Sequence, residues 1–229
     1  PFGWKKFSDY SENDLVAQYD KETNKLEFVE PEQYIKLPCE NFKRVRARGV
    51  DFILSDEHKV PYWESKDSPE MKIKTWGEIV KGLEKSRKSF RGWIKTTFDY
   101  SGQGLDLSEG ELRLQIAVQA DGRIVKEGKD NYTQMRMSKK RKYERLKWIL
   151  DTWGLRYKDN GASYNPKYEN DTEYEIIVFP KYADKIFDSK YYNATAEQLR
   201  VIKDEVGYWD GTIYDSGVIR YSTVVKENA

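Results

Sequence analysis

The stretch from Leu114 to Gly122, LQIAVQADG, joins a run of apolar residues to an aspartate and a glycine. A second stretch, Val206 to Gly211, reads VGYWDG and ends in the same pair. The apolar residues of the first stretch occupy more than one stripe of a helix, so we expect that helix to be buried on two sides. If the two helices pack side by side, the carboxylates of Asp121 and Asp210 come together at their ends.

Capping patterns predict where the helices begin. Ser108 with Glu111 and Thr195 with Gln198 form capping boxes ahead of the two apolar stretches. A third pattern, Thr75 with Glu78, predicts a helix from residue 75 to about 86. Ser138 is expected to cap a basic amphipathic helix that ends at Gly154.

The segments around the two Asp-Gly pairs resemble each other. DGRIVKEGKDNYTQMRMSKKRK follows the first helix, and DGTIYDSGVIRYSTVVKENA follows the second. Both segments show Asp-Gly, an isoleucine, a turn, a strand with a tyrosine and a lysine that begins another helix. This pattern predicts a duplicated α-β-β-α half.

The N-terminal part differs from the rest of the chain in its secondary-structure signals. Short β-favouring runs separated by turn residues fill the first 63 positions, and the helical signals become dense only after residue 108. We therefore predict an α+β protein with two domains. An all-β module occupies residues 1–100, and the duplicated domain occupies residues 101–229, with its second half truncated.

Composition narrows the class of protein. Charged residues balance, with 40 Lys and Arg against 39 Asp and Glu, so any basic face must be local. The single cysteine, Cys39, cannot form an internal disulfide. No apolar run is long enough for a membrane span, and the N-terminus has no signal-peptide pattern. We expect a soluble, cytoplasmic protein without a membrane partner.

The second half resembles the LAGLIDADG homing endonucleases in their two-motif form. Leu114, Ala120, Asp121 and Gly122 match the motif in register, and Gly207-Tyr208-Trp209-Asp210-Gly211 is similar to a variant associated with phage and intein members. Ile116 stands where the motif has its first glycine. The resemblance implies a hydrolase that cuts double-stranded DNA in both strands, and a monomer with internal pseudo-twofold symmetry.

Two carboxylates at neighbouring helix ends would be stabilised by a bound cation. A helix C-terminus carries a partial negative charge, so Asp121 and Asp210 would repel that field and each other. Hard oxygen ligands in small number suit Mg²⁺, which keeps water and takes phosphate oxygens. We therefore expect Asp121 and Asp210 to be the metal ligands and the catalytic residues of metal-dependent phosphodiester hydrolysis.

The strands that follow offer a DNA-binding surface. In the strand from Tyr132 to Met137, Gln134 and Arg136 point to one side, where they suit adenine and guanine edges. The second copy offers Arg220 and Ser222. The turn between the first strands carries cations for phosphates, namely Arg123, Lys126 and Lys129.

The first hundred residues resemble the Hint domain of inteins. Ser55-Asp56-Glu57-His58 stands where a Thr-x-x-His motif lies in that family, and His58 is the single histidine of the chain. The resemblance implies that Ser55 and His58 are remnants of a protein-splicing site. Because the chain starts at Pro1 and stops at Ala229, we do not expect it to splice.

Three functions remain open from the sequence. The first is an intein-associated, Mg²⁺-dependent homing endonuclease. The second is a cleavage-inactive DNA-binding relative, and the third is an intein fragment whose parent performs splicing. The target sequence and the host protein do not follow from the residues.

Overall fold

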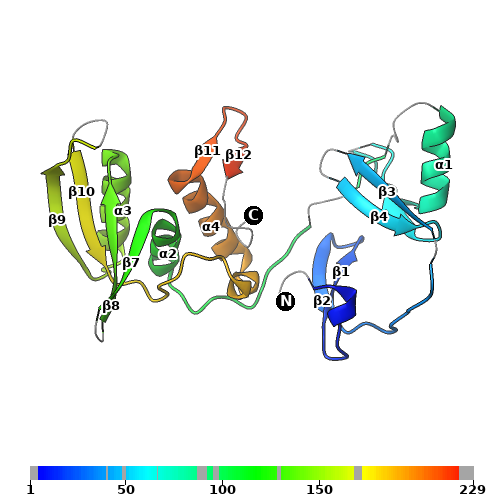
Figure 1. Ribbon diagram of the computed structural model, residues 1–229, viewed down its shortest axis with the longest axis horizontal. Helices are drawn as coiled ribbons and strands as arrows, with labels where there is room; N and C mark the ends of the chain where they lie inside the picture. Colours follow the sequence, from blue (N-terminus) through cyan, green and yellow to red (C-terminus); the bar gives the residue numbers. More distant parts are fainter. Residues whose placement is uncertain are drawn as a thin grey trace. The chain divides into compact units, whose positions relative to one another are not determined.

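Two compact units make up the chain. The computed structural model describes residues 5–39, 41–47, 50–65, 67–86, 92–94, 98–127, 130–167 and 172–221 (Figure 1). One unit is Asn13–Asp99, and the other combines Tyr100–Ala229 with Pro1–Glu12.

The unit Asn13–Asp99 contains three separate two-stranded antiparallel sheets and one helix. Its elements are β1 (Val16–Asp20), β2 (Lys25–Val29), β3 (Phe42–Ala47), β4 (Val50–Ser55), β5 (Lys59–Tyr62), β6 (Lys72–Thr75) and α1 (Trp76–Ser86). The pairs are β1 with β2, β3 with β4 and β5 with β6.

Helix α1 supplies much of the core of this unit. Trp76 and Ile79 are buried together with Val60 of β5. The indole Nε1 of Trp76 donates a hydrogen bond of 2.8 Å to the backbone oxygen of Lys43, which ties the helix to β3. The expectation of an all-β N-terminal module is therefore wrong, because the largest buried side chain of this cluster lies on a helix.

The unit that contains Tyr100–Ala229 is built around two helices and a sheet. Its elements are η1 (Phe7–Asp9), α2 (Glu109–Asp121), β7 (Gly122–Glu127), β8 (Asp130–Met137), α3 (Lys140–Thr152), β9 (Tyr157–Tyr164), β10 (Thr172–Val178), η2 (Ser189–Asn193), α4 (Ala196–Trp209), β11 (Gly211–Ile213) and β12 (Ile219–Tyr221). Four strands form an antiparallel sheet in the order β7-β8-β10-β9, and β11 pairs with β12.

One face of the four-stranded sheet is covered by α2 and α3. The strands bury Met135 and Met137 of β8 with Ile176 and Val178 of β10, against Leu146, Ile149 and Leu150 of α3. The alternation of β8 places Gln134 and Arg136 on the opposite face. That opposite face is called the outer face below.

Helix α2 lies between this layer and α4 (Figure 1). Leu114, Ile116, Ala117 and Val118 are almost fully buried, and the core around them includes Trp209 of α4. The prediction that this helix is buried on two sides is confirmed. The packing aligns the C-terminal ends of α2 and α4.

The capping predictions hold for three helices and fail for one. The boxes at Ser108 and Thr195 are formed, and Thr75 exchanges hydrogen bonds with Glu78 ahead of α1. Ser138 does not cap α3, whose N-cap is Lys139 and lacks a side-chain hydrogen bond.

The predicted duplication is incomplete in the described residues. After α2 come two long strands, a helix and two more strands, whereas after α4 the structure describes only the short hairpin β11-β12. The fold class predicted as a Hint-like all-β module and a duplicated α-β-β-α domain is contradicted, because the unit Asn13–Asp99 combines separate two-stranded sheets with a core helix, α1. In the described part of the chain, no helix is both long and apolar enough to cross a membrane.

Candidate functional site at two helix ends

Asp121 is the last residue of α2, and Asp210 is the C-cap of α4. A glycine follows each aspartate and begins a strand. A Cβ on Gly122 would lie 2.6 Å from the backbone oxygen of Val118, and one on Gly211 would lie 2.7 Å from the Cα of Gly207. The glycines are therefore required because the chain turns back closely on the helix it leaves.

A lysine lies between the two carboxylates. The Nζ of Lys142, near the start of α3, is 2.6 Å from Asp121 Oδ2 and 3.9 Å from Asp210 Oδ1. The two carboxylates are therefore no farther apart than the sum of these distances. The lysine side chain is only 13% exposed, so little water separates these charges.

Two reciprocal hydrogen bonds hold Lys142 in this position. Arg141 Nη1 donates to the backbone oxygen of Tyr208 at 3.1 Å, and the Tyr208 hydroxyl donates to the backbone oxygen of Arg141 at 2.8 Å. The guanidinium also lies over the Tyr208 ring, 5.1 Å from its centroid. These contacts fix the first turn of α3 against the last turn of α4.

The charges at the site partly offset one another. Burial, followed by repulsion from Asp121, raises the pKa of Asp210, while Lys142 and Lys185 act in the opposite direction. Lys185 also donates to the backbone oxygen of Ala120 at 3.3 Å. The repulsion expected from the sequence is therefore present, but two lysines reduce it.

We predict that Asp210→Asn stabilises the fold near neutral pH. Because the pKa of Asp210 is raised on folding, its ionisation costs stability above the raised value, and this cost disappears below the ordinary value of 3.8. The Tm should rise by about 1–3 °C at pH 7, a modest gain for a partly exposed group, and the difference should vanish near pH ~3.

The matched control for this prediction is Asp204→Asn, on the exposed side of the same helix. It removes one carboxylate from α4 without touching the pair. Thermal denaturation of both variants between acidic and neutral pH provides the measurement. A lower Tm for Asp210→Asn than for the unsubstituted protein at pH ~7 would contradict the electrostatic account.

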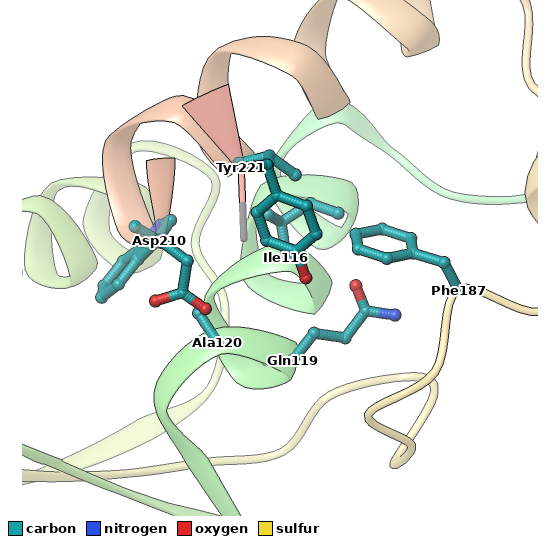
Figure 2. Close-up of a pocket in the computed structure, with 8 residues that line it drawn as sticks. Ile116, Gln119, Ala120, Phe187, Asp210 and Tyr221 are labelled. Atoms are coloured by element: carbon teal, nitrogen blue, oxygen red, sulfur yellow. The ribbon is translucent and has the colours of Figure 1, made fainter. Parts of the chain in front are cut away.

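A small pocket opens beside Asp210 between α2 and α4. Figure 2 shows Asp210, Gln119 and Tyr221 among the side chains around it. Gln119 donates from Nε2 to the backbone oxygen of Ile186 at 3.0 Å. Its Oε1 is buried without a hydrogen-bond partner among the described residues. One face of the aspartate pair thus borders a polar acceptor.

The residues predicted to contact DNA divide into two groups. Arg123 and Lys126 on β7, and Arg220 on β12, are exposed. Gln134 and Arg136 lie on the outer face of β8, where both hydrogen-bond to Glu175 of β10. The predicted alternation of β8 is confirmed, but these two side chains already have a partner within the sheet.

Of four further predicted residues, two lie outside the described chain and two belong to the other compact unit. Lys129 and Ser222 lie outside the described residues. Ser55 ends β4 and His58 is exposed in the turn that follows, where its backbone N–H donates to the Ser55 oxygen at 3.2 Å. Both belong to the unit Asn13–Asp99.

Sequence reasoning missed Lys142 and a second charged residue, Glu205. Lys142 belongs to a run of four basic residues at a helix start, a pattern that more often indicates solvated side chains. Its spacing from Leu146 and Ile149, however, places it on the buried stripe of α3. Glu205 is fully buried and is four residues from Trp209 on α4. In both cases, helical phase relative to buried residues was the available signal.

Comparison with known proteins identifies one curated relative. A ribonucleoside-diphosphate reductase subunit beta of Aquifex aeolicus (strain VF5) is 27% identical over an alignment of 269 positions, gaps included, that covers 99% of this chain and 36% of that protein. This chain therefore spans about a third of the relative's length. No family model matches the chain, and no solved structure matches it.

This comparison corrects the family and function predicted from the sequence. The relative bears the name of a reductase subunit, so the resemblance to LAGLIDADG homing endonucleases and to the Hint domain is contradicted. The predicted activity as a homing endonuclease, nuclease or hydrolase is contradicted with it, and so are membership as an inactive LAGLIDADG relative and the phage, intein and splicing associations. The predicted contacts with double-stranded DNA and Mg²⁺ are not tested by this comparison. What the comparison supports is similarity to part of an enzyme subunit.

Proposed function

We propose that the unit containing Tyr100–Ala229 is a binding module for double-stranded DNA with an Mg²⁺ site at Asp121 and Asp210. The observation that supports it best is the position of the carboxylate pair. Each aspartate immediately precedes a hairpin, and one hairpin belongs to a sheet with a polar outer face. The edge strand of that sheet, β7, begins at Gly122, directly after Asp121.

The outer face has the chemistry that reads base edges. Arg136 and Gln134 carry planar donor groups, and Arg123 lies opposite Gln134 on the neighbouring strand. Arg and Gln suit bidentate contacts to guanine and adenine in the major groove. The exposed lysine on β7, Lys126, adds a cation that suits phosphate.

The carboxylate oxygens of Asp121 and Asp210 are ligands that Mg²⁺ prefers. Lys142 places a positive charge 2.6 Å from Asp121 and 3.9 Å from Asp210. In the described part of the chain, no three or more His, Cys, Asp or Glu side chains group in a way that would hold a metal ion. Two protein carboxylates alone imply weak binding completed by water and phosphate oxygens. A bound ion would supply positive charge for nearby phosphates.

A binding titration tests the proposal. Fluorescence anisotropy with a labelled mixed-sequence duplex of about three helical turns should show saturable binding that weakens by about tenfold or more between about 50 and about 200 mM salt. Replacing Arg123 and Arg136 by alanine should weaken binding. It should also make the slope of log affinity against log salt concentration shallower, by no more than the loss of about two phosphate contacts would cause.

Two controls separate the surface from the metal site. Arg200→Ala removes an exposed arginine from α4, and it should leave binding unchanged. Asp121→Asn should abolish any gain in affinity from Mg²⁺ while leaving metal-free binding intact. Absence of duplex binding by the unsubstituted chain at low salt would refute the proposal.

The comparison favours a second candidate function. Similarity over about a third of a reductase subunit supports the view that this chain is part of a longer polypeptide and contributes to ribonucleoside-diphosphate reduction. Deleting the matching segment from the Aquifex aeolicus protein distinguishes the two candidates. Loss of reduction in the deleted protein, with normal folding of the remainder, favours the reductase role, whereas unchanged reduction favours a separate module.

A further inference from the structure

A single carboxylate joins three polar side chains on the outer face of the sheet. Strand pairing places Glu175 of β10 opposite Arg136 of β8 on one side and opposite Gly161 of β9 on the other. Gln134 lies two residues before Arg136, on the same face. Glu175 therefore stands between the strand that carries the proposed base-reading residues and the edge strand.

Both carboxylate oxygens of Glu175 accept hydrogen bonds. Arg136 Nε donates to Glu175 Oε1 at 3.0 Å, and Gln134 Nε2 donates to the same oxygen. Asn160 Nδ2 donates to Oε2 at 2.6 Å. The side chain of Glu175 is 22% exposed, so these donors compete with little water.

The carboxylate keeps its charge at neutral pH. The hydrogen bond from Asn160, assisted by those from Arg136 and Gln134, holds the pKa of Glu175 below its usual range against the opposing effect of burial. An ionised group at this point has two consequences. It repels a phosphate that approaches the face, and it holds Gln134 and Arg136 in one orientation.

Repulsion of phosphate by Glu175 lowers the affinity for any duplex. The fixed orientation of Gln134 and Arg136 favours discrimination among sequences. Contacts to phosphate carry no sequence information, whereas contacts to base edges do. A negative charge beside Arg136 penalises use of that arginine as a phosphate contact. Holding the side chains in place reduces the entropy lost when they bind a matching base.

We propose that Glu175 is a specificity-determining residue of the outer face, lowering affinity for duplex DNA in general and positioning Gln134 and Arg136 for base contacts. This inference rests on the proposed DNA binding. It concerns how the face discriminates among sequences, which the proposed function alone leaves open.

The test compares Glu175→Gln and Glu175→Asp with the unsubstituted chain. The glutamine keeps the shape but removes the charge, so affinity for a mixed-sequence duplex should increase about fivefold or more. The aspartate keeps the charge but is too short to hold all three donors, so that affinity should stay within about twofold. Both variants should flatten the sequence bias of the fraction retained from a pool of duplexes with randomised centres.

Glu144→Gln provides the matched control, because it removes an exposed carboxylate from α3, away from the outer face. It should change neither affinity nor bias. Unchanged affinity and bias in Glu175→Gln, with the unsubstituted chain binding DNA, would overturn this inference alone. Failure of all variants and the unsubstituted chain to bind any duplex would overturn the proposed function and this inference with it.

A merely structural role for Glu175 gives a different result. In that case both substitutions would lower the Tm and weaken binding to all duplexes alike. A rise in general affinity for Glu175→Gln, with the Tm retained, is an outcome that a structural role does not produce.

Discussion

Replacing Glu205 by alanine should destabilise the unit that contains α4 by about 3–5 kcal/mol, lowering its Tm by about 6–20 °C. Glu205 is fully buried. It accepts from Arg113 Nη1 at 2.5 Å, from Arg145 and from the indole of Trp209 at 3.1 Å. These partners come from three helices, α2, α3 and α4, so one carboxylate joins all of them.

The cost arises from the charges that the substitution leaves behind. Arg113 and Arg145 are 13% and 25% exposed, so neither is well hydrated without its partner. Removing one member of a buried ion pair is far more costly than the pair itself is stabilising, because the remaining charge is desolvated. Two arginines would be left in that condition, although Arg113 keeps Glu109 as a second partner.

Thermal unfolding followed by tryptophan fluorescence measures this effect, since Trp209 contacts Glu205 directly. The matched control is Glu144→Ala on α3, whose exposed pair with Lys140 should contribute less than about 1 kcal/mol. A Tm for Glu205→Ala within about 2 °C of the unsubstituted protein would show that the buried network is not what joins the helices.

Much of the helical framework could be predicted because its signals are local. Ser108 with Glu111 and Thr195 with Gln198 mark helix starts through hydrogen bonds within one turn. The Asp-Gly pairs mark where the chain leaves each helix, because only glycine fits against the preceding turn. Such signals need no knowledge of tertiary contacts.

The sheets of the N-terminal unit could not be predicted in the same way. Its strands are short and largely exposed, so their sequences do not show a buried face that fixes pairing. The sequence indicated strands there, but three separate hairpins around a helix depend on contacts such as that of Trp76 with Lys43, 33 residues away. Partners at that separation leave no local pattern.

The sequence identified acidic residues, but it did not show which donors they pair with. Asp121 and Asp210 stood out because each follows an apolar helix. Glu175, by contrast, lies in TEYEIIV, where alternation alone shows only that it shares a face with Ile177. Its three donors come from neighbouring strands, and their identity required the register of the sheet.

Replacing Lys142 by methionine should increase the affinity for Mg²⁺ about tenfold or more while destabilising the metal-free protein by about 1.5–3 kcal/mol. The lysine ammonium occupies the space between Asp121 and Asp210, so a metal ion must displace it to reach both carboxylates. Methionine keeps an unbranched side chain against the Trp209 ring, over which the Lys142 ammonium lies at 5.6 Å.

Both effects have the same physical origin. Without the lysine, two carboxylates remain at helix C-termini, and Lys185 is the other cation that acts on Asp210 among the described residues, so the metal-free state loses an internal counter-ion. The empty position then favours any small cation with two positive charges. Stability lost in the absence of metal should therefore return as Mg²⁺ is added, because a ligand that binds only the folded state stabilises it.

Thermal unfolding across an Mg²⁺ titration measures both quantities in one series. Lys140→Met removes a lysine from the same turn, but its side chain is 71% exposed, so stability and Mg²⁺ response should stay as in the unsubstituted protein. Adding Asp121→Asn to Lys142→Met should abolish the recovery, since one carboxylate cannot replace two. If Mg²⁺ stabilises Lys142→Met no more than it stabilises the unsubstituted chain, the aspartate pair is a salt-bridge site for lysine and not a site for metal.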